Sequence, residues 1–363
     1  MRYALSDRGS LITKKLVAKG ENMFKVKQLG VAAAITLFAG AAMASNFRAA
    51  DQVYVPAAGH ASSSSATFVS DVFISNLSDD SVDISVILSQ GTGGTQLPFP
   101  KILMLLPRER RELRDFVKNT LNQTSALGQL IFNACKAGAD CTPDSTTGLN
   151  ANYRNISVES RIYSVSPANA DANAVNTAPT TGQLFSGIPW YNFVSESASG
   201  AGLDKIFITG IRNTAQYRTN LGFVNASQFS TTTITATLFS GTGAQLAQNS
   251  FTLQPLGFIQ PAVGSATLFP SFVQASTSTG AYVVVQQGST NPTGDAAANG
   301  CPTGCPAFFA YGSQLDNQTN DPTTLEPQYL QPLTNNAITC IYSPDVAACK
   351  SGPTIHRAVK HQF

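Results

Sequence analysis

The chain has 363 residues, of which only 12% are charged, and its formal net charge at pH 7 is +2. This length exceeds the roughly 100–200 residues of one domain, and the net charge of +2 argues against the clearly basic surface that nucleic-acid binding requires. We therefore expect two domains with a polar, weakly charged surface and no nucleic-acid partner.

The first predicted element is an export signal. Lys25 and Lys27 precede an apolar run at residues 29–42, and residues 42–44 form a small-x-small cleavage site. This order is that of a secretory signal, and the run is shorter than the about 20 residues that span a bilayer. We predict cleavage after Ala44, with a retained membrane anchor and a later start at Met23 as alternatives. The expected location is secreted, extracellular or at the surface of a bacterium, with no membrane span after cleavage.

The six cysteines agree with export because they fall into pairs that are close in sequence. An oxidising compartment favours short disulfide-closed loops. A zinc site is less favoured, because no second pair or His lies nearby at ligand spacing. The predicted disulfide loops are closed by Cys135 and Cys141, by Cys301 and Cys305, and by Cys340 and Cys349.

The segment after the signal carries little periodicity. Gln52–Pro56 predicts a short edge strand, and the small-residue run Ala57–Ala66, which contains His60, predicts a loop. The other histidines, His356 and His361, lie near the C-terminus. With no histidine expected in a core, the sequence offers no general base for a Ser or Cys nucleophile. We therefore expect a non-enzyme with no catalytic residues.

A repeated β-hairpin organises the chain. Val72–Leu97 is echoed by Leu221–Leu246, each with an apolar strand, an Asn before a small polar turn, an alternating strand and a Gly-Thr-Gly turn. The glycines predict hairpin turns rather than phosphate loops, since neither turn continues into Gly-Lys-Ser/Thr. Period-two alternation predicts one buried face, which would comprise Val82, Ile84, Val86 and Leu88 against a solvent face of Asp83, Ser85 and Ile87.

Later strands keep the same order in both copies. Gly128–Asn133 corresponds to Gly280–Gln286, and Ile156–Val165 corresponds to Ala307–Leu315. About six or seven short strands per copy, with frequent turns, favour a sandwich over a barrel. The predicted fold class is all-β, with two tandem antiparallel immunoglobulin-like β-sandwich domains that arose by internal duplication.

One stretch of the first copy departs from the strand pattern. Within Pro107–Leu121, Leu113, Phe116, Val117 and Leu121 fall on one side at helical spacing. We predict a short amphipathic helix that caps the first sandwich, with a basic docking patch as the alternative.

The predicted domain boundaries follow these patterns. Residues 1–44 are the signal, 45–66 an N-terminal extension, 67–182 the first module with a linker, 183–332 the second module, and 333–363 a disulfide-looped tail. We expect the tail to form a clasp on the second module, a contact with another subunit, or a disordered end.

Two groups of residues are candidates for binding. Asp316, Asn317, Asn320 and Asp321 could supply oxygen ligands to calcium, although Asx residues before Pro also form ordinary turns. Trp190 and Tyr191 could contact a ligand, but a single Trp is more typical of an inter-domain contact than of a sugar platform. Beyond calcium, no cofactor is expected.

The run Tyr217–Asn225, followed by Asp316–Pro322, resembles repeats of uncharacterised secreted bacterial surface proteins. That resemblance implies immunoglobulin-type β-sandwich modules and no catalytic motif, and a fold does not fix a function.

Three functions can be compared at this point. The leading hypothesis is a non-enzymatic secreted or cell-surface structural or adhesive protein that self-assembles through strand edges, the segment Ser45–Ser70 or the tail, with its own copies and surface or matrix components as partners. The alternative is a glycan- or ligand-binding module, calcium-dependent or not. An exported hydrolase built on carboxylates alone is disfavoured, because no Asp or Glu pair stands out.

Overall fold

The structure is a computed structural model, and it describes residues 49–62, 67–142, 150–165, 181–195, 205–227, 231–270, 272, 280–287, 307–318 and 322–329. All of them belong to one compact unit, Phe47–Phe363. None of the helices in these ranges has the length and apolar character to cross a membrane. The predicted signal, the C-terminal tail and four of the six cysteines lie outside the described residues.

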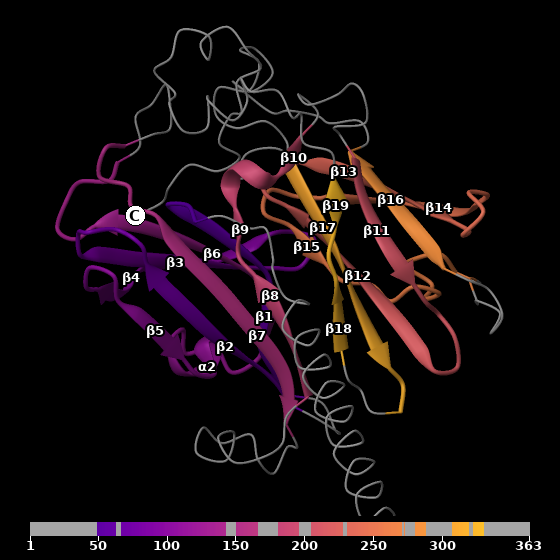
Figure 1. Ribbon diagram of the computed structural model, residues 1–363, viewed down its shortest axis with the longest axis horizontal. Helices are drawn as coiled ribbons and strands as arrows, with labels where there is room; N and C mark the ends of the chain where they lie inside the picture. The colour runs from indigo at the N-terminus through magenta and orange to yellow at the C-terminus, as the bar shows by residue number, and fades with distance from the viewer. Residues whose placement is uncertain are drawn as a thin grey trace, which may run out of the picture. The chain divides into compact units, whose positions relative to one another are not determined.

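The first half of the unit is a nine-stranded antiparallel sheet with one short helix (Figure 1). Its elements are β1 (Gln52–Ser62), β2 (Thr67–Asn76), β3 (Val82–Gln90), β4 (Thr95–Leu105), β5 (Arg110–Leu113), α2 (Phe116–Asn119), β6 (Ala126–Lys136), β7 (Ile156–Val165), β8 (Thr181–Ser186) and β9 (Ile188–Pro189). Strands β2, β5, β7 and β8 form one part, named sheet 1A, and β1, β3, β4, β6 and β9 form the other, named sheet 1B. The two parts meet where the end of β1 pairs with the start of β2.

The second half consists of two five-stranded antiparallel sheets. Sheet 2A contains β10 (Val194–Ser195), β12 (Tyr217–Asn225), β15 (Phe258–Ile259), β17 (Ala307–Asp316) and β18 (Pro322–Leu325). Sheet 2B contains β11 (Lys205–Ile211), β13 (Thr232–Phe239), β14 (Gln245–Leu253), β16 (Ala281–Gln287) and β19 (Gln328–Tyr329). A 3₁₀ turn, η2 (Trp190–Asn192), precedes β10.

The strand pairing of the first half recurs in the second. The pairs β1–β6, β3–β6, β3–β4, β2–β7, β2–β5 and β7–β8 have the counterparts β11–β16, β13–β16, β13–β14, β12–β17, β12–β15 and β17–β18. The all-β antiparallel class is therefore confirmed, and the sequence echo coincides with a repeated pairing order. Duplication as the origin of this repeat stays a prediction.

Two hydrophobic cores lie on opposite faces of sheet 1B. One lies within the first half, between sheets 1A and 1B, and includes Val55, Val72, Leu88 and Phe132. The other joins Tyr54 and further residues of the first half to the apolar core of the second half. The middle strands of sheet 1B, β1, β3 and β6, are therefore buried on both faces, whereas its edge strand β4 is mostly exposed. The second of these cores contains residues of both halves.

This shared core corrects the predicted solvent face of β3. Val82, Ile84, Val86 and Leu88 are buried as expected, but Ile87 is only 2% exposed and Ser85 is also buried. Ile87 packs in the core that the second half contributes. Because the covering residues are distant in sequence, the local alternation contained no sign of them.

The predictions for the N-terminal segment were also wrong. Residues 52–62 form one continuous strand, β1, that lies between β6 and β2 rather than at an edge. A bulge between Val55 and Ala58 accommodates Pro56. At Gly59 a Cβ would lie 2.7 Å from the carbonyl oxygen of Ala126, so the small residues allow close strand packing rather than a loop.

The predicted helix is much shorter than expected. Only Phe116–Asn119 is helical, whereas Arg110–Leu113 forms β5 and pairs with β2. The apolar residues Phe116, Val117 and Leu121 are buried as the helical spacing implied. Pairing with the free side of β2 thus determines the conformation of the arginine-rich part.

Candidate functional site

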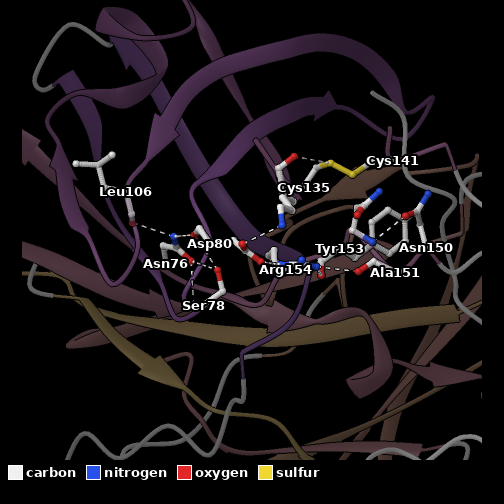
Figure 2. Close-up of polar contacts among 12 residues, drawn as sticks. Asn76, Ser78, Asp80, Leu106, Cys135, Cys141, Asn150, Ala151, Tyr153 and Arg154 are labelled. Atoms are coloured by element: carbon white, nitrogen blue, oxygen red, sulfur yellow. Dashed lines mark hydrogen bonds and ion pairs between the residues drawn. A yellow bond between two sulfur atoms is a disulfide. The ribbon is translucent and has the colours of Figure 1, made fainter. Parts of the chain in front are cut away.

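A polar cluster closes one end of the first half (Figure 2). Arg154 Nε donates to Oδ2 of Asp80 at 2.7 Å, and Nζ of Lys136 lies 3.1 Å from Oδ1. The Arg154 guanidinium, with the Lys136 ammonium, holds the pKa of the Asp80 carboxyl below its ordinary value. Both oxygens of this carboxylate are thus engaged by cations, which indicates a structural clamp.

The Asn of the repeated hairpin has the same task in both halves. Asn76 Nδ2 donates to the carbonyl oxygens of Asp80 and Leu106, and its Oδ1 accepts the Ser78 N–H (Figure 2). Asn225 Nδ2 likewise donates to the carbonyl oxygens of residues 253 and 254, and its Oδ1 accepts the Ser227 N–H. The repeated Asn-x-Ser motif therefore ties the turn after β2 or β12 to the end of β4 or β14.

The described cysteines form the disulfide that the sequence predicted. Cys135 at the end of β6 is bonded to Cys141, and both are buried (Figure 2). The other four, Cys301, Cys305, Cys340 and Cys349, lie outside the described residues.

A buried histidine was missed by the sequence analysis. His60 lies in β1 and is only 5% exposed, with its Nδ1 2.9 Å from Oδ1 of Asp115 and 3.0 Å from Oδ2. Asp115, 1% exposed, has a left-handed backbone with φ of 42° at the start of α2. The expectation of no core histidine was wrong because Ala57–Ser62 is strand rather than loop.

Asp71 extends this buried network. Its Oδ1 accepts the Asp115 N–H at 2.9 Å and the Tyr163 hydroxyl at 3.1 Å. Burial raises the pKa of the Asp71 carboxyl above its ordinary value, and it also raises the pKa of the Tyr163 hydroxyl. The hydrogen bonds connect β2, β7 and the start of α2, so the network supports the first half from within.

Trp190 lies between the two cores. Its ring packs against both core clusters, and its Nε1 donates to Oδ1 of Asp51 at 2.9 Å. A ring held in this way supports a structural contact rather than a sugar platform. The side chain of Tyr191 lies outside the described residues.

The structure describes only half of the predicted calcium group. Asp316 Oδ1 accepts the Gln318 N–H at 2.7 Å, as in an ordinary Asx turn. Asn317 Oδ1 accepts from Nη1 of Arg218 at 2.7 Å. Asn320 and Asp321 lie outside the described residues, and the part of the chain that is described holds no cluster of three or more His, Cys, Asp or Glu groups suited to a metal.

The long sheet edges differ sharply in their protection. Edge strands can pair with another chain unless Pro, Lys, bulges or covering segments prevent it. Strand β4 has Pro98, Pro100 and Lys101 along its length, and its register with β3 shifts between Ile84 and Val86. The edge of β8 is engaged by β18, since Gln183 Nε2 donates to Oγ1 of Thr324 at 2.9 Å.

Strand β14 has neither Pro nor Lys, and its one register shift with β13 lies near its start, between Leu238 and Phe239. The Phe269 N–H reaches only a side chain of this strand, Oδ1 of Asn249, at 3.1 Å. Its sequence QLAQNSFTL contains no Pro and no charged residue, and its register with β13 runs without a shift from Ala247 to Leu253. Its residues are mostly exposed or half-buried, and Leu246 is 49% exposed. Among the described residues, β14 is therefore the long edge strand best suited to pair with a further strand, and it is the candidate functional site.

The exposed side chains of β14 continue a polar ladder on β13. Hydroxyl oxygens of Thr235 and Ser250 lie 3.0 Å apart, and Gln248 Nε2 donates to Oγ1 of Thr237 at 3.1 Å. No sequence pattern considered above predicted β14 as a functional edge. The contrast with Pro98, Pro100 and Lys101 at the matching place was available in the sequence.

Comparison with known proteins identifies no family and finds only distant structural likenesses. No family model and no curated protein matches the chain. A β-glucuronidase 2 of Bacteroides uniformis is 9% identical, with 75% of this chain and 25% of that chain covered and a TM-score of 0.14. A lectin from Pleurotus ostreatus in complex with GalNAc is 10% identical, with 81% and 78% covered and a TM-score of 0.16. At these TM-scores neither likeness carries an argument about function, and the chain spans about a quarter of the length of the glucuronidase.

Proposed function

We propose that this chain is a non-enzymatic structural or adhesive protein, secreted or held at the cell surface, that self-assembles through a strand edge. The shared core carries the proposal. The middle strands of sheet 1B, β1, β3 and β6, are covered on both faces, and Ser89 Oγ of β3 donates to the carbonyl oxygen of Leu256 at 2.8 Å. Two sandwiches joined in this way make one body rather than two modules on a flexible linker, which suits a load-bearing role.

The engagement of the reactive groups supports the same proposal. His60, Asp80 and Asp115 each have ion-pair or hydrogen-bond partners that join strands or turns. The low charge of the surface and the predicted signal favour export, and the partners are copies of the chain and surface or matrix components. Assembly by a free N-terminal donor strand is not proposed, because residues 52–62 are already β1 inside the fold.

Fractionation of cells that produce the chain, followed by negative-stain microscopy of the outer fraction, tests this function. We expect the chain in the extracellular or surface fraction as assemblies larger than a monomer. A variant that lacks residues 1–44 is the matched control and should stay inside the cell. Monomers confined to the cell interior in both variants would overturn the proposal.

A further inference from the structure

The outer side of β14 offers backbone groups for a further strand. A strand that is paired on one side only directs alternate N–H and C=O groups away from its neighbour. Strand β14 pairs with β13 over Thr232–Phe239 and is the last strand of sheet 2B within the described part of the chain. An incoming antiparallel strand would thus extend sheet 2B.

The side chains of β14 are complementary to themselves. Amides and hydroxyls both donate and accept hydrogen bonds, and those of Gln248, Ser250 and Thr252 already approach the hydroxyls of three threonines on β13. The strand has no charge, so a second copy would meet no like-charge repulsion. The other long edge, β4, carries two prolines and Lys101, so it lacks two backbone donors and places a positive charge at the approach.

We propose that β14 of one chain pairs antiparallel with β14 of a second copy about a two-fold axis near Asn249, the middle of the strand. This inference rests on the proposed function and names the partner and the strand. Such a contact uses the same surface on both copies, and it closes after two chains. The product is a dimer with one continuous sheet across both copies, so longer assemblies would need a second, different contact.

Sedimentation velocity of the purified full chain over a range of concentrations tests this pairing. The substitution Ser250→Lys places two ammonium groups near the axis, and like charges on facing strands destabilise the pair. We expect the dimer dissociation constant to rise by about tenfold or more, which corresponds to about 1.4 kcal/mol. Ser250→Ala, which removes only the hydroxyl, should change it by much less.

Thr95→Lys on β4 is the matched control, because it adds the same charge to an exposed position on the protected edge. It should leave the dimer unchanged, and urea unfolding should show that both Lys variants remain folded. A dimer that resists Ser250→Lys, or that responds equally to Thr95→Lys, would overturn the β14 pairing but leave self-assembly intact. A native chain that stays monomeric at every concentration would overturn the pairing and the self-assembly together.

Discussion

At the scale of single residues, His60 and Asp115 form a polar pair inside the first half. Both side chains are almost fully buried, so neither can regain its lost hydration if the partner is removed. Breaking a buried pair on one side leaves the other group without compensation, which costs more than the pair itself contributes.

The substitution His60→Ala should therefore lower the free energy of unfolding by about 3 kcal/mol. Arg108→Ala is the control, since Arg108 pairs with Asp79 at the surface, where both side chains are largely exposed, and it should cost about 0.5 kcal/mol or less. Urea unfolding measures both. Equal losses of stability for the two substitutions would show that the buried pair contributes no more than a surface pair.

Asp71 provides a pH-dependent prediction at the same scale. Its folded pKa is raised above the ordinary value of 3.8, mainly by burial. Because the pKa of this carboxyl is higher in the folded than in the unfolded protein, its contribution to stability is fully present below pH 3.8. That contribution is lost as the pH rises through the folded pKa. Asp71→Asn keeps an oxygen for the Asp115 and Tyr163 donors but carries no charge, so it should stabilise the protein at pH 7.

Urea midpoints measured from pH 3 to pH 8 check this prediction. The gain from Asp71→Asn should shrink toward pH 3. Asp80→Asn should behave in the opposite way, because Arg154 and Lys136 lower the pKa of Asp80. Loss of these ion pairs should lower the stability at pH 7, and this effect should shrink in acid. A gain from Asp71→Asn that does not depend on pH would contradict the role of its charge.

At the scale of elements, the turn between β3 and β4 shows how the halves are joined. The Phe258 N–H donates to the Gly91 carbonyl oxygen at 2.9 Å, and the Gln254 N–H donates to that of Thr92 at 3.0 Å. Gly94 has a φ of 62°, and a Cβ there would lie 1.9 Å from the carbonyl oxygen of Pro255. This turn is therefore a contact between the halves as well as a hairpin.

Gly94→Ala should cost more than the same change in the matching turn of the second half. Gly243 has a φ of 86° but no neighbour within 4 Å of an added Cβ, so Gly243→Ala should cost about 1 kcal/mol for the backbone conformation alone. Gly94→Ala adds the clash and should cost about 2–4 kcal/mol in total. Equal losses in the free energy of unfolding for the two substitutions would mean that the turn is not packed against the second half.

The same elements show what local sequence could and could not predict. The alternation in β3 placed Val82 and Ile84 in a core, and both are buried, because period-two patterns depend on the strand itself. The burial of Ile87 and the strand conformation of His60 depend on partners far along the chain, so no local pattern contained them. The lack of Pro and charge in β14 is visible in the sequence. It indicates an unprotected edge only after the structure has shown that β14 is an edge strand.

At the scale of the whole molecule, the two repeated halves are less independent of each other than tandem modules would be. Apolar residues of both halves form one core, and Tyr54 Oη of β1 donates to the carbonyl oxygen of Ala226 at 3.3 Å. For the proposed structural role, the shared core and the edge of β14 are complementary features, because a load applied at that edge would reach both halves through the core.

Differential scanning calorimetry of the purified full chain tests the shared core, on which the proposed function rests, most directly. If the halves are one body, they should unfold in a single transition whose calorimetric enthalpy equals the van't Hoff enthalpy. Two separable transitions would contradict the account. The contradiction would be clearest if Gly94→Ala shifted one transition while no substitution in the first half shifted the other.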